Sequence, residues 1–260
     1  MSNVNEFEII NNTLKKYIGE SCDVVIPDGV EAIGESAFWD CGDIITLTIP
    51  ESVTEIGDFA FGWADSLKSV NLPTRITKIS NSAFFSCKSL ANITIPKSVT
   101  DIKNSAFYCC ESIITVEIPN SVINIGESAF YKCKSLENIT ISKNTTYIGN
   151  SAFANCKNLR TITIPDSVKF IDEYAFAWCD ALKSIVLGKN VESISKGAFD
   201  ACPISTVYYM GSETDFSNIK IENTENDEFL SATKYFYSEE TPTKEGSFWR
   251  YVDNVPTKWE

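Results

Sequence analysis

Seven of the nine cysteines in this 260-residue chain recur at a spacing of 23 residues, with Ala64 in the one missing place: Cys41, Cys87, Cys110, Cys133, Cys156, Cys179 and Cys202. Zinc would need four ligands that converge on one point, and no Cys-x-x-Cys pair is present. Neighbours in a stacked column lie about 5 Å apart and point the same way, which does not suit a disulfide. We therefore expect a buried ladder of free thiols, with no metal and no cofactor, and the most exposed thiols at Cys22 and Cys109.

Histidine, the commonest residue for acid–base catalysis, is missing from the chain. The chain therefore also lacks the usual partner of a serine or cysteine nucleophile. Two carboxylates about 5–10 Å apart across a cleft could still cleave a glycoside. The recurrent acidic residues instead share one column of the 23-residue pattern, which suggests capping and solvating charges: Glu35, Asp58, Glu127 and Glu173. The sequence therefore predicts no catalytic residues and a protein that is not an enzyme.

The formal net charge of −13 disfavours partners that carry many phosphates. An acidic surface repels nucleic-acid backbones and anionic membrane surfaces, so we expect no nucleic-acid partner. No segment is apolar and long enough to span a bilayer, so no membrane insertion is expected. The first residues lack the basic and apolar regions of a signal peptide, which favours the cytoplasm if Met1 is the native start.

A repeat organises most of the chain. The dipeptide Ile-Pro or its equivalent begins at residues 26, 49, 72, 95, 118, 141, 164 and 187, a constant step of 23. A fixed period of this length is typical of a solenoid, in which each unit buries its apolar face against its neighbours. We therefore expect eight repeats over residues 26–209, an N-terminal capping hairpin over 1–25 and a C-terminal cap over 210–260.

Each repeat contains the same apolar columns. Isoleucine recurs from Ile33 to Ile194 and phenylalanine from Phe38 to Phe199, and we expect the phenylalanines to form the spine of the core. The alternation at Leu67, Val70 and Leu72 indicates a strand that ends at the following proline. The Ser-Ala-Phe stretch, preceded by polar residues, predicts a short helical or 3₁₀ segment.

The repeat resembles those of leucine-rich-repeat proteins, and most closely the BspA-like family. The segment from Ile118 to Leu136, with the letters IPNSVINIGESAFYKCKSL, carries the family pattern throughout, and the resemblance covers residues 23–209. It implies an α/β leucine-rich-repeat solenoid, with a parallel β-sheet on the concave face, short helical or 3₁₀ segments on the convex face and β-hairpin caps. It also implies protein binding or adhesion, with a host or extracellular-matrix protein as partner, at the cell surface or in secreted form if the chain belongs to a longer protein. The family brings no catalytic residues.

Two faces of the predicted solenoid are candidates for binding a partner. The first consists of outward strand positions, mostly Thr and Asn: Thr46, Thr48, Asn92, Thr94, Thr115, Glu117, Asn138, Thr140, Thr161 and Thr163. The second is an aromatic stripe just after the phenylalanine column: Trp39, Trp63, Phe85, Tyr108, Tyr131 and Trp178. Threonine also suits strands for its branched shape, and large rings also cover gaps between coils, so a structural role stays open for both.

The ends of the chain predict caps. Residues 7–17 suggest two strands around an Asn-Asn turn. A short helix is expected near Ser212, followed by strands at 234–237 and 247–252 and a tight turn at 253–254. We expect this aromatic hairpin to seal the last coil of a monomer. The alternative is that the solenoid is a spacer presenting the hairpin to a cell-wall or glycan ligand.

Overall fold

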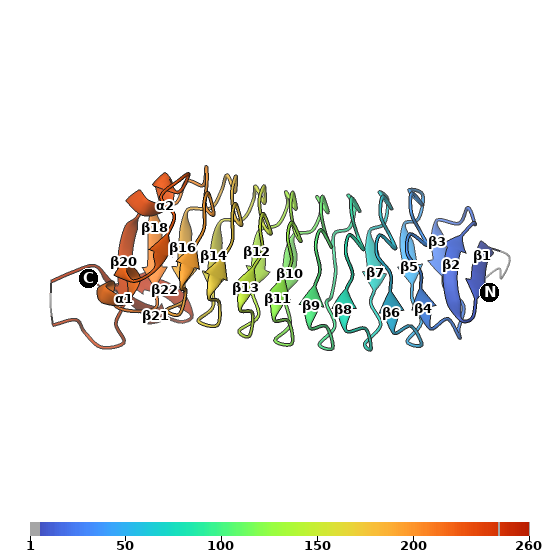
Figure 1. Cartoon of the computed structure of the whole chain (residues 1–260), viewed down its shortest axis with the longest axis horizontal. Coiled ribbons are helices and arrows are strands. Elements are labelled where there is room, and N and C mark those ends of the chain that lie inside the picture. Colours follow the sequence, from blue (N-terminus) through green and yellow to red (C-terminus); the bar gives the residue numbers. More distant parts are fainter. Residues whose placement is uncertain (1–5, 244, 260) are drawn as a thin grey trace.

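The protein is an elongated parallel-strand solenoid in the computed structural model, which describes residues 6–243 and 245–259. The coils stack in one row, with the two ends of the chain at opposite ends of the row (Figure 1). The predicted leucine-rich-repeat solenoid is thus confirmed. In the part of the chain that the structure describes, no helix has the length and apolar character needed to span a membrane.

The predicted repeat strands lie in one parallel row along the solenoid, which we call the main sheet, although its strand pairing is interrupted at two places. Neighbouring strands pair in the register of the repeat, so that Val24 lies opposite Leu47 and Leu47 opposite Val70. Inward residues are buried and outward ones are mostly exposed. Its strands are β3 (Asp23–Val25), β5 (Thr46–Thr48), β7 (Ser69–Asn71), β10 (Thr115–Glu117), β12 (Asn138–Thr140), β14 (Thr161–Ile164), β16 (Ser184–Leu187), β18 (Thr206–Tyr209) and β20 (Thr233–Tyr237).

A second row of parallel strands, most of them two residues long, runs along another side of the coils (Figure 1). Each two-residue strand ends in the isoleucine column or its equivalent, and Leu14 takes that place inside the longer first strand, so these residues pair as well as pack. The strands are β2 (Thr13–Tyr17), β4 (Ala32–Ile33), β6 (Glu55–Ile56), β8 (Lys78–Ile79), β9 (Asp101–Ile102), β11 (Asn124–Ile125), β13 (Tyr147–Ile148), β15 (Phe170–Ile171), β17 (Ser193–Ile194) and β19 (Lys220–Ile221). This row was not predicted from the repeat pattern.

The Ser-Ala-Phe segments form turns in place of the expected short helical or 3₁₀ segments. Each turn has two residues in the left-handed region, such as Ser36 with φ 55° and Asp40 with φ 59°, which interrupt a right-handed helix. The turns instead bond from coil to coil, as where Phe38 N donates to Ala60 O at 2.8 Å. Two five-residue helices follow the repeats, namely α1 (Glu213–Ser217) and α2 (Asp227–Ser231).

The phenylalanine column is the spine of the core, as predicted. All eight phenylalanines are at most 1% exposed. Their rings stack on one another, and Tyr17 and Phe229 extend the stack at its two ends, with centroids 4.9–5.5 Å apart throughout. One unbroken apolar core therefore joins each coil to the coils next to it.

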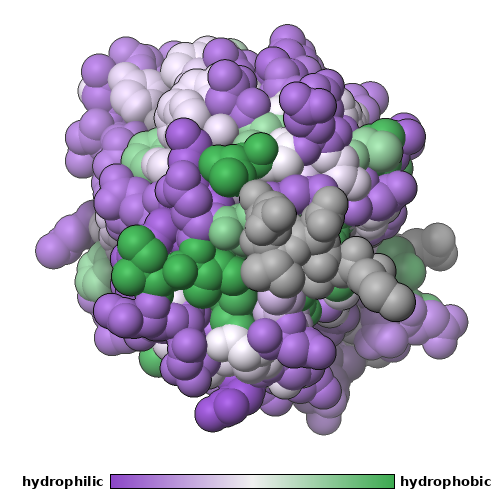
Figure 2. Space-filling model, turned by 90° about the vertical axis from the view of Figure 1, so that its right-hand side faces the viewer, coloured by the Kyte–Doolittle hydropathy of each residue, from purple (hydrophilic) through white to green (hydrophobic). Residues whose placement is uncertain are grey.

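The N-terminal end is closed by an antiparallel hairpin of β1 (Phe7–Ile10) and β2, as predicted. Its turn residues Asn11 and Asn12 both have positive φ, a conformation that asparagine tolerates. Figure 2 looks onto this end and shows apolar side chains gathered among hydrophilic ones. Ile9, Ile10 and Ile18 are among the exposed large apolar residues of the chain.

The C-terminal end continues the solenoid by one irregular coil after the repeats. Helix α1 begins where the sequence predicted, with Ser212 as its N-cap and Asp215 completing a capping box. Beyond it, β19 pairs with β17, β20 with β18, and Phe229 stacks on Phe199. A hairpin of β21 (Phe248–Val252) and β22 (Val255–Lys258) then completes the main sheet.

The buried amide of Asn226 holds this last coil in place. Its Nδ2 donates to Ser195 O at 2.9 Å and Glu222 O at 2.7 Å, and its Oδ1 accepts from Phe199 N at 3.2 Å. We expect Asn226→Ala to lower the free energy of unfolding by about 1–3 kcal/mol, because it leaves buried backbone groups without partners. Urea denaturation measures this loss. An equal loss in the exposed control Asn218→Ala would contradict the role given to Asn226.

Candidate binding faces

The thiol column is buried, as predicted, and it forms hydrogen bonds. From Cys87 to Cys202, each S–H donates to the carbonyl oxygen of the column phenylalanine in the preceding coil, at 3.0–3.3 Å. Burial raises the pKa of five thiols far above the ordinary range: Cys87, Cys110, Cys133, Cys156 and Cys179. A neutral thiol that donates a hydrogen bond is neither a metal ligand nor a nucleophile.

Outside this row the thiols are more accessible. Cys22 is exposed, while Cys109 and Cys41 are both half-buried, so only the first of the two expected exposed thiols is fully open. All nine cysteines are free. Among residues 6–243 and 245–259, no group of three or more His, Cys, Asp or Glu side chains is placed to hold a metal ion.

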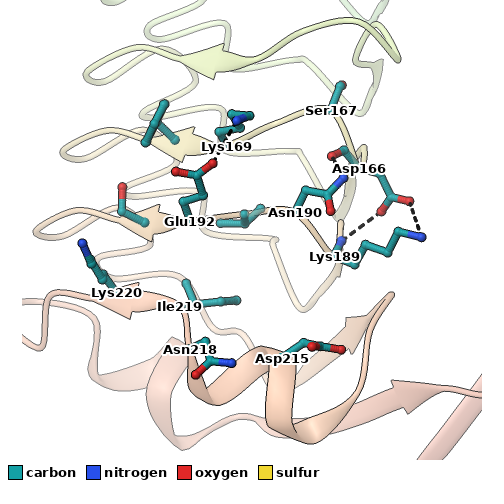
Figure 3. A pocket seen from close by; sticks show the side chains of 13 residues that line it. Asp166, Ser167, Lys169, Lys189, Asn190, Glu192, Asp215, Asn218, Ile219 and Lys220 are labelled. Carbon is teal, nitrogen blue, oxygen red and sulfur yellow. Dashed lines mark hydrogen bonds and ion pairs between the residues drawn. The ribbon is translucent and has the colours of Figure 1, made fainter.

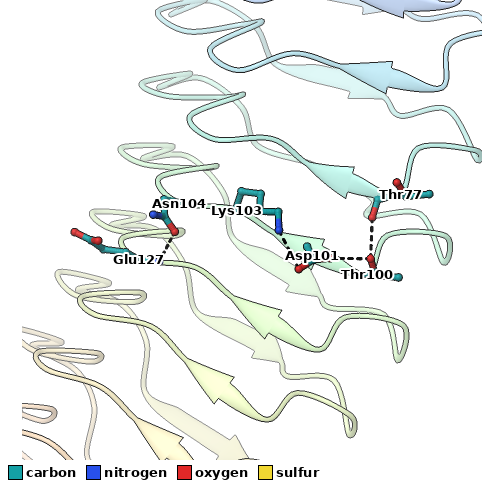
Figure 4. A network of polar contacts seen from close by, with 6 residues as sticks. All are labelled: Thr77, Thr100, Asp101, Lys103, Asn104 and Glu127. Carbon is teal, nitrogen blue, oxygen red and sulfur yellow. Dashed lines mark hydrogen bonds and ion pairs between the residues drawn. The ribbon is translucent and has the colours of Figure 1, made fainter.

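The recurrent acidic column lies along the turns, where its members form a ladder with Asn residues of neighbouring coils. Asp58 accepts hydrogen bonds from the backbone and side-chain nitrogens of Asn81, and Asn104 accepts one from Glu127 N at 3.1 Å. In Figure 4 the Glu127 carboxylate extends away from the polar contacts made by Asp101 and Lys103. These contacts fit the capping role that the sequence predicted for the column.

All ten residues of the candidate strand face are exposed on the main sheet. Two hollows indent this face, one of about 490 Å³ under β5 and β7 and one of about 430 Å³ beside β10. Thr94 and Pro96 line both hollows, so the two meet at this coil. Thr46, Thr48, Asn92, Thr115 and Glu117 also line them, whereas the other four predicted residues lie further along the sheet.

The hollows coincide with the first of two interruptions of the main sheet, the second of which lies between β12 and β14. The coil between β7 and β10 contributes only one bridge, from Asn92 to Ser69, and β10 pairs with β12 alone. Just before it, the Asn71 side chain accepts from Ile49 N and donates to Ile49 O, at 3.2 and 3.1 Å, in place of a backbone partner. The sheet therefore opens around Thr94.

The aromatic stripe is a stack of rings on the turn side, stacked from Phe85 to Tyr131 and tilted at its Trp39 and Trp63 end. Five members lie in contact from coil to coil, with centroids 4.4–4.8 Å apart: Trp39, Trp63, Phe85, Tyr108 and Tyr131. The next position is Ala154, which ends the stack. Trp178 stands apart and stacks on Tyr174 at 5.8 Å. The structure thus brings five of the six predicted residues together.

The largest hollow described, about 820 Å³, was not anticipated from the sequence. It lies between α1 and the edges of the last two repeats (Figure 3). Many of its charged residues pair with each other, as Lys169 does with Glu192 at 3.0 Å and Lys189 with Asp166 at 3.9 Å. Because α1 lies outside the periodic sequence, the repeat pattern contained no signal for this hollow.

Comparison with solved structures finds leucine-rich-repeat proteins of bacteria. A leucine-rich-repeat protein from Bacteroides ovatus superposes with a TM-score of 0.70 at 28% identity, over 76% of this chain and 53% of its own. This chain therefore spans about half the length of that protein. A leucine-rich-repeat protein of T. pallidum matches with a TM-score of 0.54 at 25% identity, over 77% of this chain and 88% of its own.

A protein from Faecalibacterium prausnitzii, described as a leucine-rich cell surface protein, shares the fold with a TM-score of 0.53. It is 21% identical over 85% of this chain and 95% of its own. No curated protein sequence matches this chain. The sequence profile of the BspA type leucine rich repeat region matches in six copies, over residues 8–122 and 100–228. Together with the in-register columns and the solenoid, this match shows that the chain belongs to the BspA-type leucine-rich-repeat family.

Proposed function

We propose that this protein is a non-catalytic interaction module of the adhesion type, and that its main sheet binds a protein partner. Leucine-rich-repeat proteins are generally protein-interaction modules, and solenoids present extended surfaces suited to this. The observation that carries the proposal is the pair of joined hollows around Thr94 on an exposed polar face.

The chemistry of this face suits a protein surface. Its side chains are short, so little conformational entropy is lost when a partner covers them. Hydroxyl and amide groups can both donate and accept hydrogen bonds. Lys97 and Glu117, which line the second hollow, add one charge of each sign. We therefore expect a partner with a protruding polar segment, such as a loop of a host or extracellular-matrix protein.

The alternative, a spacer that presents the C-terminal hairpin to a glycan, has less support. Trp249 is fully buried, and its Nε1 donates to Tyr209 O at 2.9 Å. The ring of Trp259 is covered by the Arg250 guanidinium at 3.9 Å. Both indoles are thus occupied in closing the solenoid.

Charge substitution tests the proposed face. In a quantitative pull-down from the natural surroundings of the protein, Thr94→Glu should reduce capture of the partner at least tenfold. Thr161→Glu is the matched control, because it makes the same change on β14, outside both hollows, and should retain capture. Equal melting temperatures would show that both variants fold. If both variants capture the partner as the wild type does, the main sheet is not the binding face.

A further inference from the structure

The aromatic stack ends abruptly at Trp39. One repeat earlier, the corresponding position is Lys16, which has no ring to continue the stack. The Trp39 indole packs against Trp63, which is tilted by 51° with its ring centroid 4.4 Å away, and against Gly62, where a Cβ atom would stand 3.0 Å from the indole. The other four rings each lie between neighbours or against the end of the stack at Ala154, whereas Trp39 is 43% exposed.

A hollow of about 720 Å³ occupies the place where the next ring of the stack would lie. It is bordered by Trp39 and Phe59 from the first two repeats and by Lys15 and Lys16 of β2. Phe59 meets the indole edge-on at 5.4 Å and forms an apolar corner. The hollow is large enough for a small ligand of one to three rings.

The rim of this hollow is polar and balanced in charge. Lys15 and Lys16 contribute two ammonium groups, and Glu35 and Asp40 contribute two carboxylates. Within the described residues, none of these four side chains takes part in an ion pair, although seven such pairs form elsewhere on the surface. The hollow therefore combines one flat apolar wall with unengaged donors and acceptors of both kinds.

We propose that this hollow is a binding site for a neutral pyranose sugar, which lies on the free face of Trp39. A pyranose has an apolar face of C–H groups that packs on an indole, and a rim of hydroxyls that both donate and accept hydrogen bonds. The two carboxylates disfavour an anionic ligand and the two ammonium groups a cationic one. An aromatic side chain of a partner would leave the four charged groups without hydrogen-bond partners.

This site lies on the turn side, away from the main sheet, and does not rest on the function proposed above. Saturation-transfer NMR with the full chain tests it, using methyl glycosides of glucose, galactose, mannose and N-acetylglucosamine and their neutral β-linked trimers as probes. At least one probe should bind, with transfer strongest at the C–H groups of one sugar face. Trp39→Ala should weaken that binding at least tenfold.

Two further variants serve as controls for the roles of Trp39 and of the hollow. Trp178→Ala removes an indole that is 38% exposed but lines none of the four hollows described above, and it should leave sugar binding unchanged. Lys16→Trp supplies the missing ring, and it should abolish binding with the melting temperature kept or raised. The proposal is overturned if no probe binds, if Trp39→Ala and Trp178→Ala act alike, or if a Trp-containing peptide competes while no sugar does. Thr94→Glu should leave sugar binding intact, so failure of one proposal leaves the other standing.

Discussion

Raising the pH from 8 to about 10.5 is expected to unfold this protein in a steep transition that depends on its buried thiols. Burial holds the pKa of Cys87, Cys110, Cys133, Cys156 and Cys179 well above the ordinary value, which is about 8.5 in an unfolded chain. Below that pH both states keep these protons, and the thiols' contribution to stability is fully present. Above it the unfolded chain binds fewer protons than the native one, so stability falls as pH rises.

The free energy of unfolding is expected to fall steeply with pH because the effects of the five thiols add. Each thiol lowers the free energy of unfolding by about 1.4 kcal/mol per pH unit once it is ionised in the unfolded chain. The five together lower it by roughly 7 kcal/mol per pH unit. Domains of this kind are stable by about 5–15 kcal/mol, so unfolding within one to two units is expected. Urea denaturation at several pH values, with a phosphine reductant present to prevent disulfides, measures the slope.

A triple variant with Cys110, Cys133 and Cys156 changed to alanine is the matched control. Ala64 already fills this column in the second repeat, so the change is one that the coil accommodates. Its stability should fall by only about 3 kcal/mol per pH unit over the same range. Equal slopes in the variant and the wild type would show that the buried thiols do not govern alkaline unfolding.

Removing one ring from the middle of the spine should have the largest effect of any single substitution at neutral pH. Phe130 is fully buried and stacks on Phe107 at 5.1 Å and on Phe153 at 5.3 Å. Phe130→Ala loses the burial of a whole ring and leaves a cavity between two coils, which costs about 3–5 kcal/mol. Urea denaturation of the whole chain measures the loss.

A substitution at the end of the spine serves as the comparison for Phe130→Ala. Phe229 stacks only on Phe199 within the phenylalanine column, and its coil has a neighbour in the repeats on one side alone. In a one-dimensional stack, Phe229→Ala should loosen the terminal coil and leave the remaining coils folded. Hydrogen exchange should then rise in residues 213–237 only. If Phe130→Ala also affected only its own coil, the coils would not form one cooperative stack.

The features that depend on the 23-residue period could be predicted from the sequence. A column that recurs every 23 residues must form a row in a stack, so the phenylalanine spine, the thiol row and the main-sheet strands were all predictable. The C-terminal coil was not, because Phe229 continues the spine after 30 residues instead of 23. Its irregular spacing hides it from any search for a repeat.

Local backbone geometry was the other feature that could not be predicted from the sequence. The turns take up left-handed conformations at residues such as Asp40, Ser86 and Trp63, where no glycine marks them. That conformation excludes the helical segments that the Ser-Ala-Phe pattern suggested. The opening of the main sheet at Thr94 follows the coil in which the Asn71 side chain bonds to Ile49, and the hollow at Trp39 lies where Lys16 supplies no ring. Both are departures from the repeat, and the binding proposals rest on them.

Hydrogen–deuterium exchange on the complex with the captured partner tests the central claim most directly. If the main sheet binds the partner, protection should concentrate in residues 92–97 and 115–119 and should be absent when Thr94→Glu is mixed with the same partner. Residues 248–258 and the turns of the aromatic stripe should exchange as in the free protein. Protection confined to the C-terminal hairpin or to the stripe, with residues 92–97 unchanged, would contradict the account.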